Sequence, residues 1–414
     1  MKLETYKLGD VSIIVNGATP STSDASNYDG SVVWITPKDL SAQKTKFVNK
    51  GARNISKKGY DSCSTQIIPA NNILMSSRAP IGLLAINGVD CCTNQGFKNI
   101  VIDKCKCDVD YLYYYLKNHI REIEALGSGT TFKEISRASL QNYTIRIPSL
   151  TEQKKIGSIL SLLDSKIELN RRINDNLEAM AKQLYDYWFV QFDFPNEESK
   201  PYKSSGGEMV WNEKLKREIP KGWKVVPLNS WLDIKSGFAF KSETYQQDGL
   251  YKIITIKNVQ EHHLDTSGCA CISILPIGFK EWCKLTINDR LISLTGNCGR
   301  MCIVTEDKLL LNQRVGLLCC EDYLLNYAYA LLSSTEYQTT CENLAKGAAQ
   351  ANLSPVELCK SMAILPPQTI ALQFDKHISC LINKHIQCER ENIFFTKLRD
   401  EISPLLMNGQ IEIE

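Results

Sequence analysis

The chain has 414 residues, of which 43% are hydrophobic and 23% charged, and its formal net charge is +2. This composition is that of an ordinary globular protein, which excludes extensive disorder, and the length allows two to four domains with cores of their own. No apolar run is long enough to span a membrane and residues 1–5 lack a signal-peptide core, so we expect a soluble, cytoplasmic protein without membrane contact.

Residues 1–150 read as short strands separated by turns, followed by one helix. Apolar runs at about residues 11–15, 32–35 and 73–75 each end in a turn signal such as Asn16-Gly17 or Thr36-Pro37. Residues 110–124 then carry apolar side chains at helical spacing. These features predict an α+β domain over residues 1–150.

A cluster of positive charge lies inside this domain. Between residues 40 and 60 there is no acidic residue, and the basic residues are Lys44, Lys46, Lys50, Arg53, Lys57 and Lys58. The segment is either a solvated loop or an edge that contacts phosphate groups.

The period changes to seven from residue 151. Two apolar positions per heptad continue to residue 189, interrupted only by Asn170 and Asn174, and this pattern predicts a coiled-coil helix on the order of 58 Å long. A buried asparagine costs stability in such a seam and fixes the register of the helices. We expect residues 151–192 to form a spacer helix and the two asparagines to align it with a partner.

The rest of the chain repeats this order. A polar connector (residues 193–221) precedes a second α+β domain (222–367), a second long helix (368–403) and a short tail (404–414). The second helix keeps a seven-residue spacing but has His385, Asn392 and Arg399 at partner positions of its seam. Two long amphipathic helices in the order domain, helix, domain, helix would bury their apolar faces against each other and run antiparallel.

Short phrases of the first half also return about 218 residues later. Asn94-Gln95 recurs as Asn312-Gln313, and the turn from Ser76 to Gly82 recurs as that from Ser293 to Gly299. A period of this length indicates two copies of a whole domain rather than a solenoid. Duplex DNA has an approximate twofold axis, so a protein with two similar domains can address two half-sites.

The chain also resembles a known family over essentially its whole length. The matching segments are QKKI at residues 153–156, LDSKIELN at 163–170, LYDYWF at 184–189, EMVW at 208–211, EIPKGW at 218–223 and LLMNGQI at 405–411. In this order, and beside the internal repeat, they resemble the specificity subunits of Type I restriction-modification systems.

The resemblance implies a fold, a function and a set of partners. It implies two target-recognition domains joined by two long antiparallel coiled-coil helices, each domain reading one half of a split DNA sequence. It also implies two modification subunits that bind S-adenosylmethionine and methylate adenine, and restriction subunits that use ATP and magnesium. This chain would then hold no cofactor of its own.

Nothing in the sequence indicates catalysis by this chain. No dinucleotide-binding or P-loop glycine motif occurs, and the only Pro-Pro pair, Pro366-Pro367, lacks the flanking residues of adenine methyltransferases. The sixteen cysteines form no CxxC pair, which favours reduced thiols packed as small apolar side chains. We predict neither a metal site nor a catalytic site.

Candidate DNA contacts are the basic residues that could reach base edges or phosphates, since arginine and lysine pair with guanine. They are Lys57, Lys58, Arg78 and Lys98 in the first domain, and Lys241, Lys257, Arg300 and Arg314 in the second. The recurring Asn-Gln pair favours a structural role in a turn, because domains that read different sequences should differ at base-reading positions. Arg78 and Arg300 lie where the repeats differ and are the stronger candidates.

Aromatic residues are concentrated at the end of the first long helix. Such a patch often marks a protein interface, so Tyr185, Trp188, Phe189 and Phe192 are candidate contacts with the modification subunit. Packing inside the chain is the alternative. For the whole protein, the alternatives are a decoy or anti-restriction scaffold that keeps only the helices and an unrelated coiled-coil tether.

Overall fold

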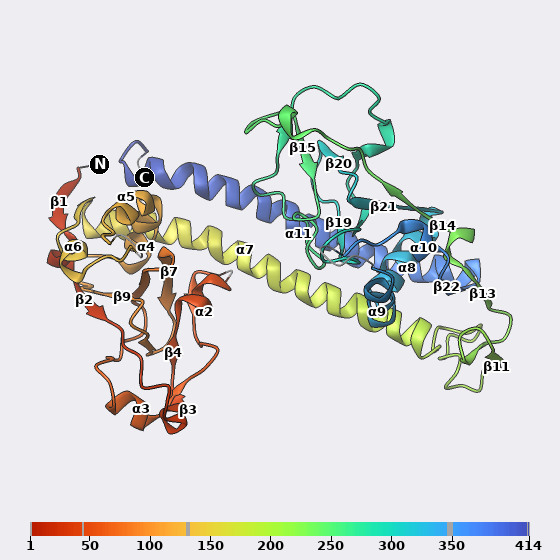
Figure 1. Ribbon diagram of the computed structural model, residues 1–414, viewed down its shortest axis with the longest axis horizontal. Coiled ribbons are helices and arrows are strands. Elements are labelled where there is room, and N and C mark those ends of the chain that lie inside the picture. Colours follow the sequence, from red (N-terminus) through yellow and green to blue (C-terminus); the bar gives the residue numbers. More distant parts are fainter. Residues whose placement is uncertain (1, 44, 130–132, 346–350, 412, 414) are drawn as a thin grey trace. The chain divides into compact units, whose positions relative to one another are not determined.

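The structure is a computed structural model that describes residues 2–43, 45–129, 133–345, 351–411 and 413 (Figure 1). Its contacts divide the chain into two compact units. Unit 1 comprises Met1–Leu169 and Asn392–Glu414, and unit 2 comprises Asn170–Glu391. Both units therefore combine a domain of short strands with segments of two long helices. None of the helices in the described ranges has the length and apolar character that a membrane span requires.

The strands of unit 1 are β1 (Glu4–Lys7), β2 (Ser12–Asn16), β3 (Tyr28–Val32), β4 (Trp34–Ile35), β5 (Phe47–Val48), β6 (Ile73–Ser77), β7 (Ile81–Asn87), β8 (Cys92–Thr93), β9 (Lys98–Ile102) and β10 (Thr144–Ile147). Five of them form a sheet in the order β2-β9-β6-β7-β5, and β1-β10 and β4-β8 form separate pairs. All five residues of the central strand β6 are buried, whereas Ile13 on the edge strand β2 is exposed. A strand covered on both faces needs a continuous apolar run, which explains the apolar residues at the start of β6, Ile73 to Met75.

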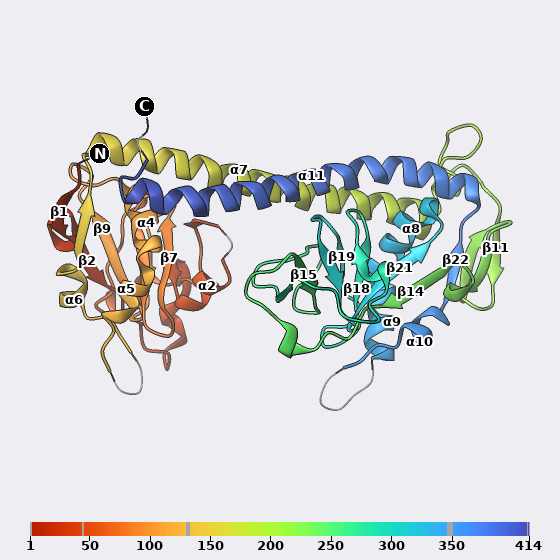
Figure 2. The ribbon, with the colours of Figure 1, turned by 90° about the horizontal axis from the view of Figure 1, so that it is seen from above.

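The helices of unit 1 are α1 (Leu8–Val11), α2 (Pro37–Ser41), α3 (Lys57–Asp61), α4 (Val109–Asn118), α5 (Ile120–Ala125) and α6 (Arg137–Gln141). The predicted helix at residues 110–124 is present as α4 and α5, which meet at His119. The Asp108 side chain caps α4 by accepting from the amide of Tyr111 at 3.0 Å. The buried side of α4 packs against the sheet, as Figure 2 shows.

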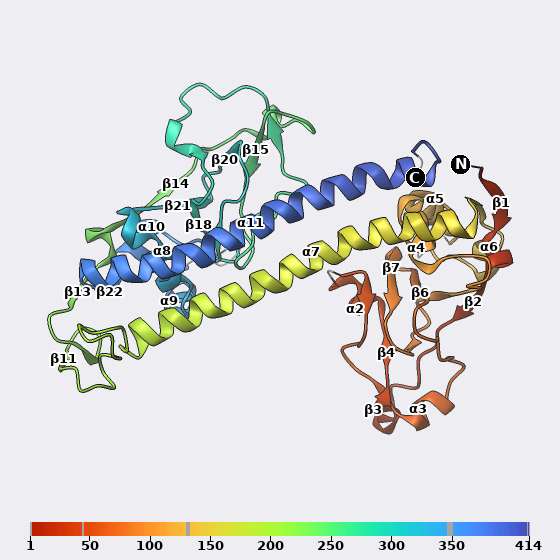
Figure 3. The ribbon, with the colours of Figure 1, turned by 180° about the vertical axis from the view of Figure 1, so that it is seen from behind.

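The strands of unit 2 are β11 (Met209–Asn212), β12 (Arg217–Pro220), β13 (Lys224–Pro227), β14 (Leu232–Ser236), β15 (Tyr251–Ile254), β16 (Cys271–Ile272), β17 (Lys284–Leu285), β18 (Arg290–Ser293), β19 (Met301–Ile303), β20 (Leu309–Leu311), β21 (Val315–Cys320) and β22 (Met362–Leu365). They form two four-stranded sheets, β14-β21-β18-β19 and β16-β15-β20-β17, and the pairs β11-β12 and β13-β22. Figure 3 shows the β15-β20 sheet beside the β18-β21 sheet. The shorter helices are α8 (Asp322–Ser333), α9 (Thr335–Leu344) and α10 (Pro355–Cys359).

The two units share a topology, as the sequence repeat predicts. The order β2-β9-β6-β7 in unit 1 corresponds to β14-β21-β18-β19 in unit 2, and the pair β1-β10 corresponds to β13-β22. The residue after β1 and the residue after β13 make equivalent backbone hydrogen bonds. The amide of Leu8 donates to the carbonyl of Tyr143 at 2.8 Å, and the amide of Leu228 donates to the carbonyl of Ser361 at 2.9 Å. The chain is therefore a duplication of one α+β domain.

Both predicted long helices are present as α7 (Leu150–Tyr185) and α11 (Gln368–Met407). A capping box starts α7. The Glu152 carboxylate accepts from the backbone amide of Ser149, and the Ser149 hydroxyl accepts from the backbone amide of Glu152. The helix α11 runs past the predicted end at residue 403 and stops in a Schellman motif. There the amide of Gln410 bonds to Leu405 at 2.9 Å, and Gly409 has a φ of 68°.

Within each unit the segments of α7 and α11 run antiparallel. In unit 2 the Asn170 amide group donates to Glu391 at 3.0 Å, and the Asn174 amide group donates to Glu389 at 2.6 Å. In unit 1, Asp164 accepts from Arg399 at 2.6 Å. The two predicted asparagines are thus buried and hydrogen-bonded to the partner segment, which fixes the register in unit 2.

The sixteen cysteines are free thiols. Nine of them are buried, and burial raises the pKa of Cys92 to about 11 and that of Cys91 to about 12. Thiols with such pKa values stay protonated and behave as small apolar side chains.

Candidate nucleic-acid interface

A serine-centred turn occurs at the same place in both units. In unit 1 the Ser76 hydroxyl donates to the carbonyl of Pro80 at 2.7 Å and accepts from the amide of Leu83 at 2.8 Å. In unit 2 the Ser293 hydroxyl accepts from the amide of Arg300 at 3.0 Å. A buried hydroxyl therefore holds both turns.

The recurring Asn-Gln pair forms a second shared turn. The side-chain oxygen of Asn94 accepts from the amide of Gly96 at 2.9 Å, and that of Asn312 accepts from the amide of Arg314 at 3.2 Å. Asparagine commonly bonds to the backbone two residues ahead in this way. The structural role that the sequence favoured for the pair is thus present for its asparagine.

The two turns are joined to each other identically in both units. The amide of Ser77 bonds to the carbonyl of Gly96 at 2.7 Å, and the amide of Leu294 bonds to that of Arg314 at 3.0 Å. We call the loops around Ser76 and Asn94 the first loop cluster, and those around Ser293 and Asn312 the second loop cluster. Their backbone hydrogen bonds do not depend on most of the side chains that the loops carry.

A glycine in each unit allows the preceding strand to approach the Asn-Gln turn. A Cβ atom at Gly17 would lie 1.9 Å from the carbonyl oxygen of Asn94, and one at Gly237 would lie 2.2 Å from that of Leu311. These distances exclude any larger residue without a backbone shift. The loop that contains this glycine therefore joins each cluster as a third loop, at the same place in both units.

The side chains on this shared backbone differ between the units. Arg78 occupies the place that Thr295 has in unit 2, and Arg300 occupies the place of Leu83. The Arg78 side chain is 38% exposed and lies 3.7 Å from a carboxylate oxygen of Glu134. Arg78 and Arg300 are therefore confirmed as positions where the repeats diverge, while their contact with DNA stays a prediction.

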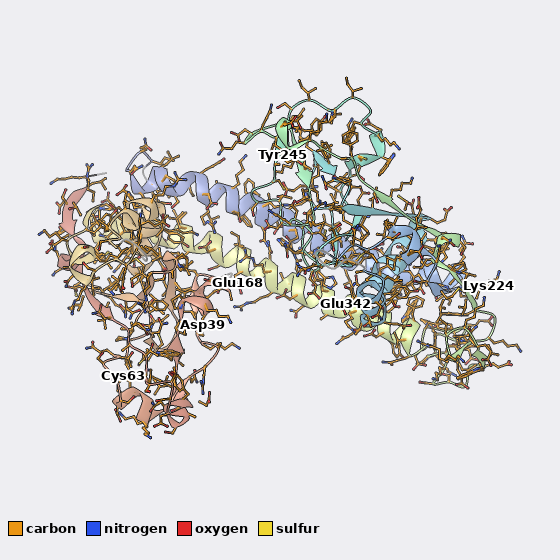
Figure 4. The ribbon with its side chains drawn as sticks, in the orientation of Figure 1. Asp39, Cys63, Glu168, Lys224, Tyr245 and Glu342 are labelled. Carbon is orange, nitrogen blue, oxygen red and sulfur yellow. The ribbon has the colours of Figure 1, made fainter. Side chains whose placement is uncertain are left out.

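Arg300 borders a hollow of about 520 Å³ in unit 2. Its guanidinium donates to the side-chain oxygen of Gln260 at 3.0 Å. The same hollow is lined by Glu261 and by Glu342 of α9, which Figure 4 labels. Arg300 is thus half-buried in a hollow that acidic residues also line, whereas the other candidate of the second loop cluster, Arg314, is exposed.

Lys98 is not available as a surface contact. Its side chain is 9% exposed, and its ammonium group lies 3.0 Å from the Glu134 carboxylate. Because Glu134 also faces Arg78, the buried lysine holds the carboxylate next to that arginine. We therefore reassign Lys98 from DNA contact to support of the first loop cluster.

Most of the basic segment at residues 40–60 is neutralised inside unit 1. Lys57 pairs with Asp61 at 2.6 Å and Lys58 with Asp24 at 2.8 Å, although both lysines are exposed on α3. Arg53 is likewise paired with an aspartate, at 2.8 Å. Lys44 lies outside the described residues. The segment is thus not a run of unpaired positive charge.

The remaining candidates lie on the surface of unit 2. Lys241 and Lys257 are exposed, and Arg314 lines a hollow of about 410 Å³ together with Gln313 and Asn352. Of the predicted DNA contacts in unit 1, Arg78 and Lys98 lie together in the first loop cluster. Arg300 and Arg314 belong to the second cluster, and Lys57 and Lys58 lie apart on α3.

The aromatic residues at and after the end of α7 lie in the core of unit 2. Tyr185, Trp188, Phe189 and Phe192 have exposed fractions of 6%, 3%, 3% and 2%. They cover one another and pack on Trp223 and other aromatic residues of unit 2. The expected aromatic surface is therefore an internal cluster, as the alternative interpretation held, and these four side chains offer little surface to a partner.

The adjacent histidines have separate partners. The His262 ring lies 3.1 Å from the hydroxyl of Tyr329, and the His263 ring lies 3.2 Å from Glu389. Burial lowers the pKa of His262, which favours its neutral form. Among the described residues, no group of three or more His, Cys, Asp or Glu side chains is arranged to hold a metal ion.

Comparison with known proteins identifies the family. The model of the Type I restriction modification DNA specificity domain matches twice, at residues 2–179 and 220–391. The chain belongs to this family. Both matched regions contain one loop cluster and one copy of the repeated sheet.

Individual relatives agree with this assignment. The chain is 31% identical to the Type I restriction enzyme MjaIX specificity subunit of Methanocaldococcus jannaschii, over 99% of this chain and 94% of that protein. It is 27% identical to the EcoR124I/EcoR124II specificity subunit of Escherichia coli, over 48% of this chain and 50% of that one. The crystal structure of the Type I S subunit from M. genitalium has the same fold, with a TM-score of 0.60, 17% identity, and coverage of 98% of this chain and 96% of that chain.

Proposed function

We propose that this chain is the DNA sequence-recognition subunit of a Type I restriction-modification complex and reads a bipartite, asymmetric site with one half-site per domain. The observation that carries the proposal is the pair of loop clusters, which share backbone hydrogen bonds but carry different side chains, with Arg78 in place of Thr295 and Arg300 in place of Leu83. A common frame with different side chains is what two readers of different sequences require.

The chemistry of the complex would belong to other subunits. We propose that two modification subunits bind S-adenosylmethionine and methylate adenine, that restriction subunits use ATP and magnesium, and that this chain holds no cofactor and no catalytic site. Its role would be to bind double-stranded DNA and position these partners in the cytoplasm. Membership of the specificity-subunit family supports this division of labour.

Methylation mapping tests the proposal directly. Genomes of cells with and without this gene should differ in one split adenine motif whose two halves have different sequences. A contiguous motif would contradict the bipartite reading. If deletion of the gene removes no motif, and the protein binds no DNA at any salt concentration, the decoy or anti-restriction scaffold is favoured.

Substitution of the two diverging arginines separates the half-sites. Arg78→Ala should relax one half of the motif and Arg300→Ala the other, by about 1–3 kcal/mol if each arginine makes a bidentate contact with guanine. Uniform weakening on all sequences would mean that these arginines contact phosphate only.

The long helices supply a test of spacing. Residues 169 and 170 of α7, and residues 391 and 392 of α11, are where the chain passes between the units. One heptad inserted at both places keeps every contact within each unit and adds about 10 Å of helix, so the spacer between half-sites should grow by about three base pairs. A heptad in α7 alone should instead give insoluble protein, because the pairing registers of the two units then conflict. An unchanged spacer in the doubly inserted variant would refute the role of the helices as a ruler.

A further inference from the structure

The structure separates the two residues of the recurring Asn-Gln pair. Asn94 and Asn312 are used by the turn, as their hydrogen bonds to the backbone show. Gln95 and Gln313 are exposed in both units. The turn needs the asparagine, but it gives no reason for a glutamine at the next position.

The glutamine side chains are only partly engaged within the described parts of the chain. The Gln95 carbonyl oxygen accepts from the hydroxyl of Thr19, and its Nε2 group makes no hydrogen bond there. Within the same described ranges, the Gln313 carboxamide makes none. Both carboxamides therefore reach solvent, and the turn itself uses neither of them fully.

Each glutamine also lies beside the residues that differ between the units. Arg78 is close to the turn of Gln95, because its Nε atom lies 3.8 Å from the Cβ position of Gly96. Gln313 is followed by the exposed Arg314 and lines the same hollow as Thr295. A shared exposed residue within diverging surroundings suits a target feature that both half-sites have in common.

We propose that Gln95 and Gln313 each read an adenine, one in each half-site. A glutamine carboxamide matches the major-groove edge of adenine, since its oxygen accepts from N6 and its Nε2 group donates to N7. The Thr19 hydroxyl contacts only the Gln95 oxygen, so this contact does not engage Nε2. This inference rests on the proposed function. It adds one base that both half-sites share and the residue of each domain that reads it.

Methylation maps of single variants provide the first measurement. In the complete complex, Gln95→Ala should relax one adenine position in one half-site by roughly ten- to a hundredfold and leave the other half unchanged, and Gln313→Ala should do the reverse. Each variant is the matched control of the other. Gln95→Glu should resemble Gln95→Ala, because a carboxylate cannot donate to N7.

A modified base provides the second measurement. Replacing the affected adenine by 7-deazaadenine removes the N7 acceptor, so DNA binding by the wild-type complex should weaken while binding by Gln95→Ala should not weaken further. A wild-type complex with no split motif would refute the proposed function. A wild-type split motif that both glutamine variants read unchanged would refute this inference alone, and equal loss at every base of a half-site would assign the glutamines to phosphate contact.

Discussion

The aromatic cluster after α7 allows a decisive stability experiment with Phe189→Ala. The Phe189 ring is 3% exposed, and its centroid lies 4.6 Å from that of Tyr327 and 4.8 Å from that of Phe374. Removing a fully buried phenyl ring costs about 3–5 kcal/mol, because apolar burial is lost and a cavity remains. Two close aromatic pairs place the expected loss in unit 2 near the middle of this range, at about 4 kcal/mol.

The measurement is urea unfolding of the full chain followed by the fluorescence of Trp188 and Trp223, which lie in the same cluster. For a unit of this size, the corresponding decrease in the melting temperature is roughly 8–16 °C. Tyr187→Ala is the control, because the Tyr187 side chain is 37% exposed and its loss should change stability by no more than about 0.5 kcal/mol. The reasoning is refuted if Phe189→Ala unfolds like the wild type and only loses co-purification with the modification subunit.

Three further predictions concern ionisable groups that are buried or partly buried. Arg290 is fully buried and donates to Asn326 at 2.7 Å, so Arg290→Ala should destabilise unit 2 by about 3 kcal/mol and the similarly sized Arg290→Met by clearly less, as denaturant midpoints would show. Asp110→Ala should destabilise unit 1 more than Lys46→Met in the same assay, because it leaves the buried Lys46 ammonium without the carboxylate that lies 2.7 Å away. Burial and neighbouring carboxylates raise the pKa of Glu178 from 4.5 to about 8, so unfolding releases a proton between these values and unit 2 should lose stability as the pH rises through this window. Glu178→Gln should abolish that decrease in a pH series of unfolding curves.

The helices and the repeat could be predicted from the sequence because their causes are local or periodic. The seam of α7 follows from a seven-residue spacing, and Ile156, Leu160 and Ile167 are buried as that spacing requires. The repeated turns follow from single residues, a serine and an asparagine, that each satisfy nearby backbone groups. A pattern read along the chain contains this information.

The surface of the site could not be predicted, because it depends on partners that are distant in sequence. Lys46 looks like part of an exposed basic segment, but its ammonium group is buried against Asp110 and Ser161. Phe189 looks like an interface residue until Trp223 and Phe374 are placed around it. Charge or aromatic density along the sequence therefore indicates an interface only where the fold leaves those side chains uncovered.

The distribution of these hydrogen bonds suggests how one domain can acquire a new specificity without losing its fold. The loop clusters are held by backbone groups and by the shared serine and asparagine, whereas Arg78 and Arg300 replace a threonine and a leucine on the same backbone. Each domain is secured to its long helices elsewhere, through Lys46 on Ser161 in unit 1 and through Asn326 on Asp375 in unit 2. Substitutions on the loop surface leave those contacts intact, so their effects on stability and on base reading should be nearly independent.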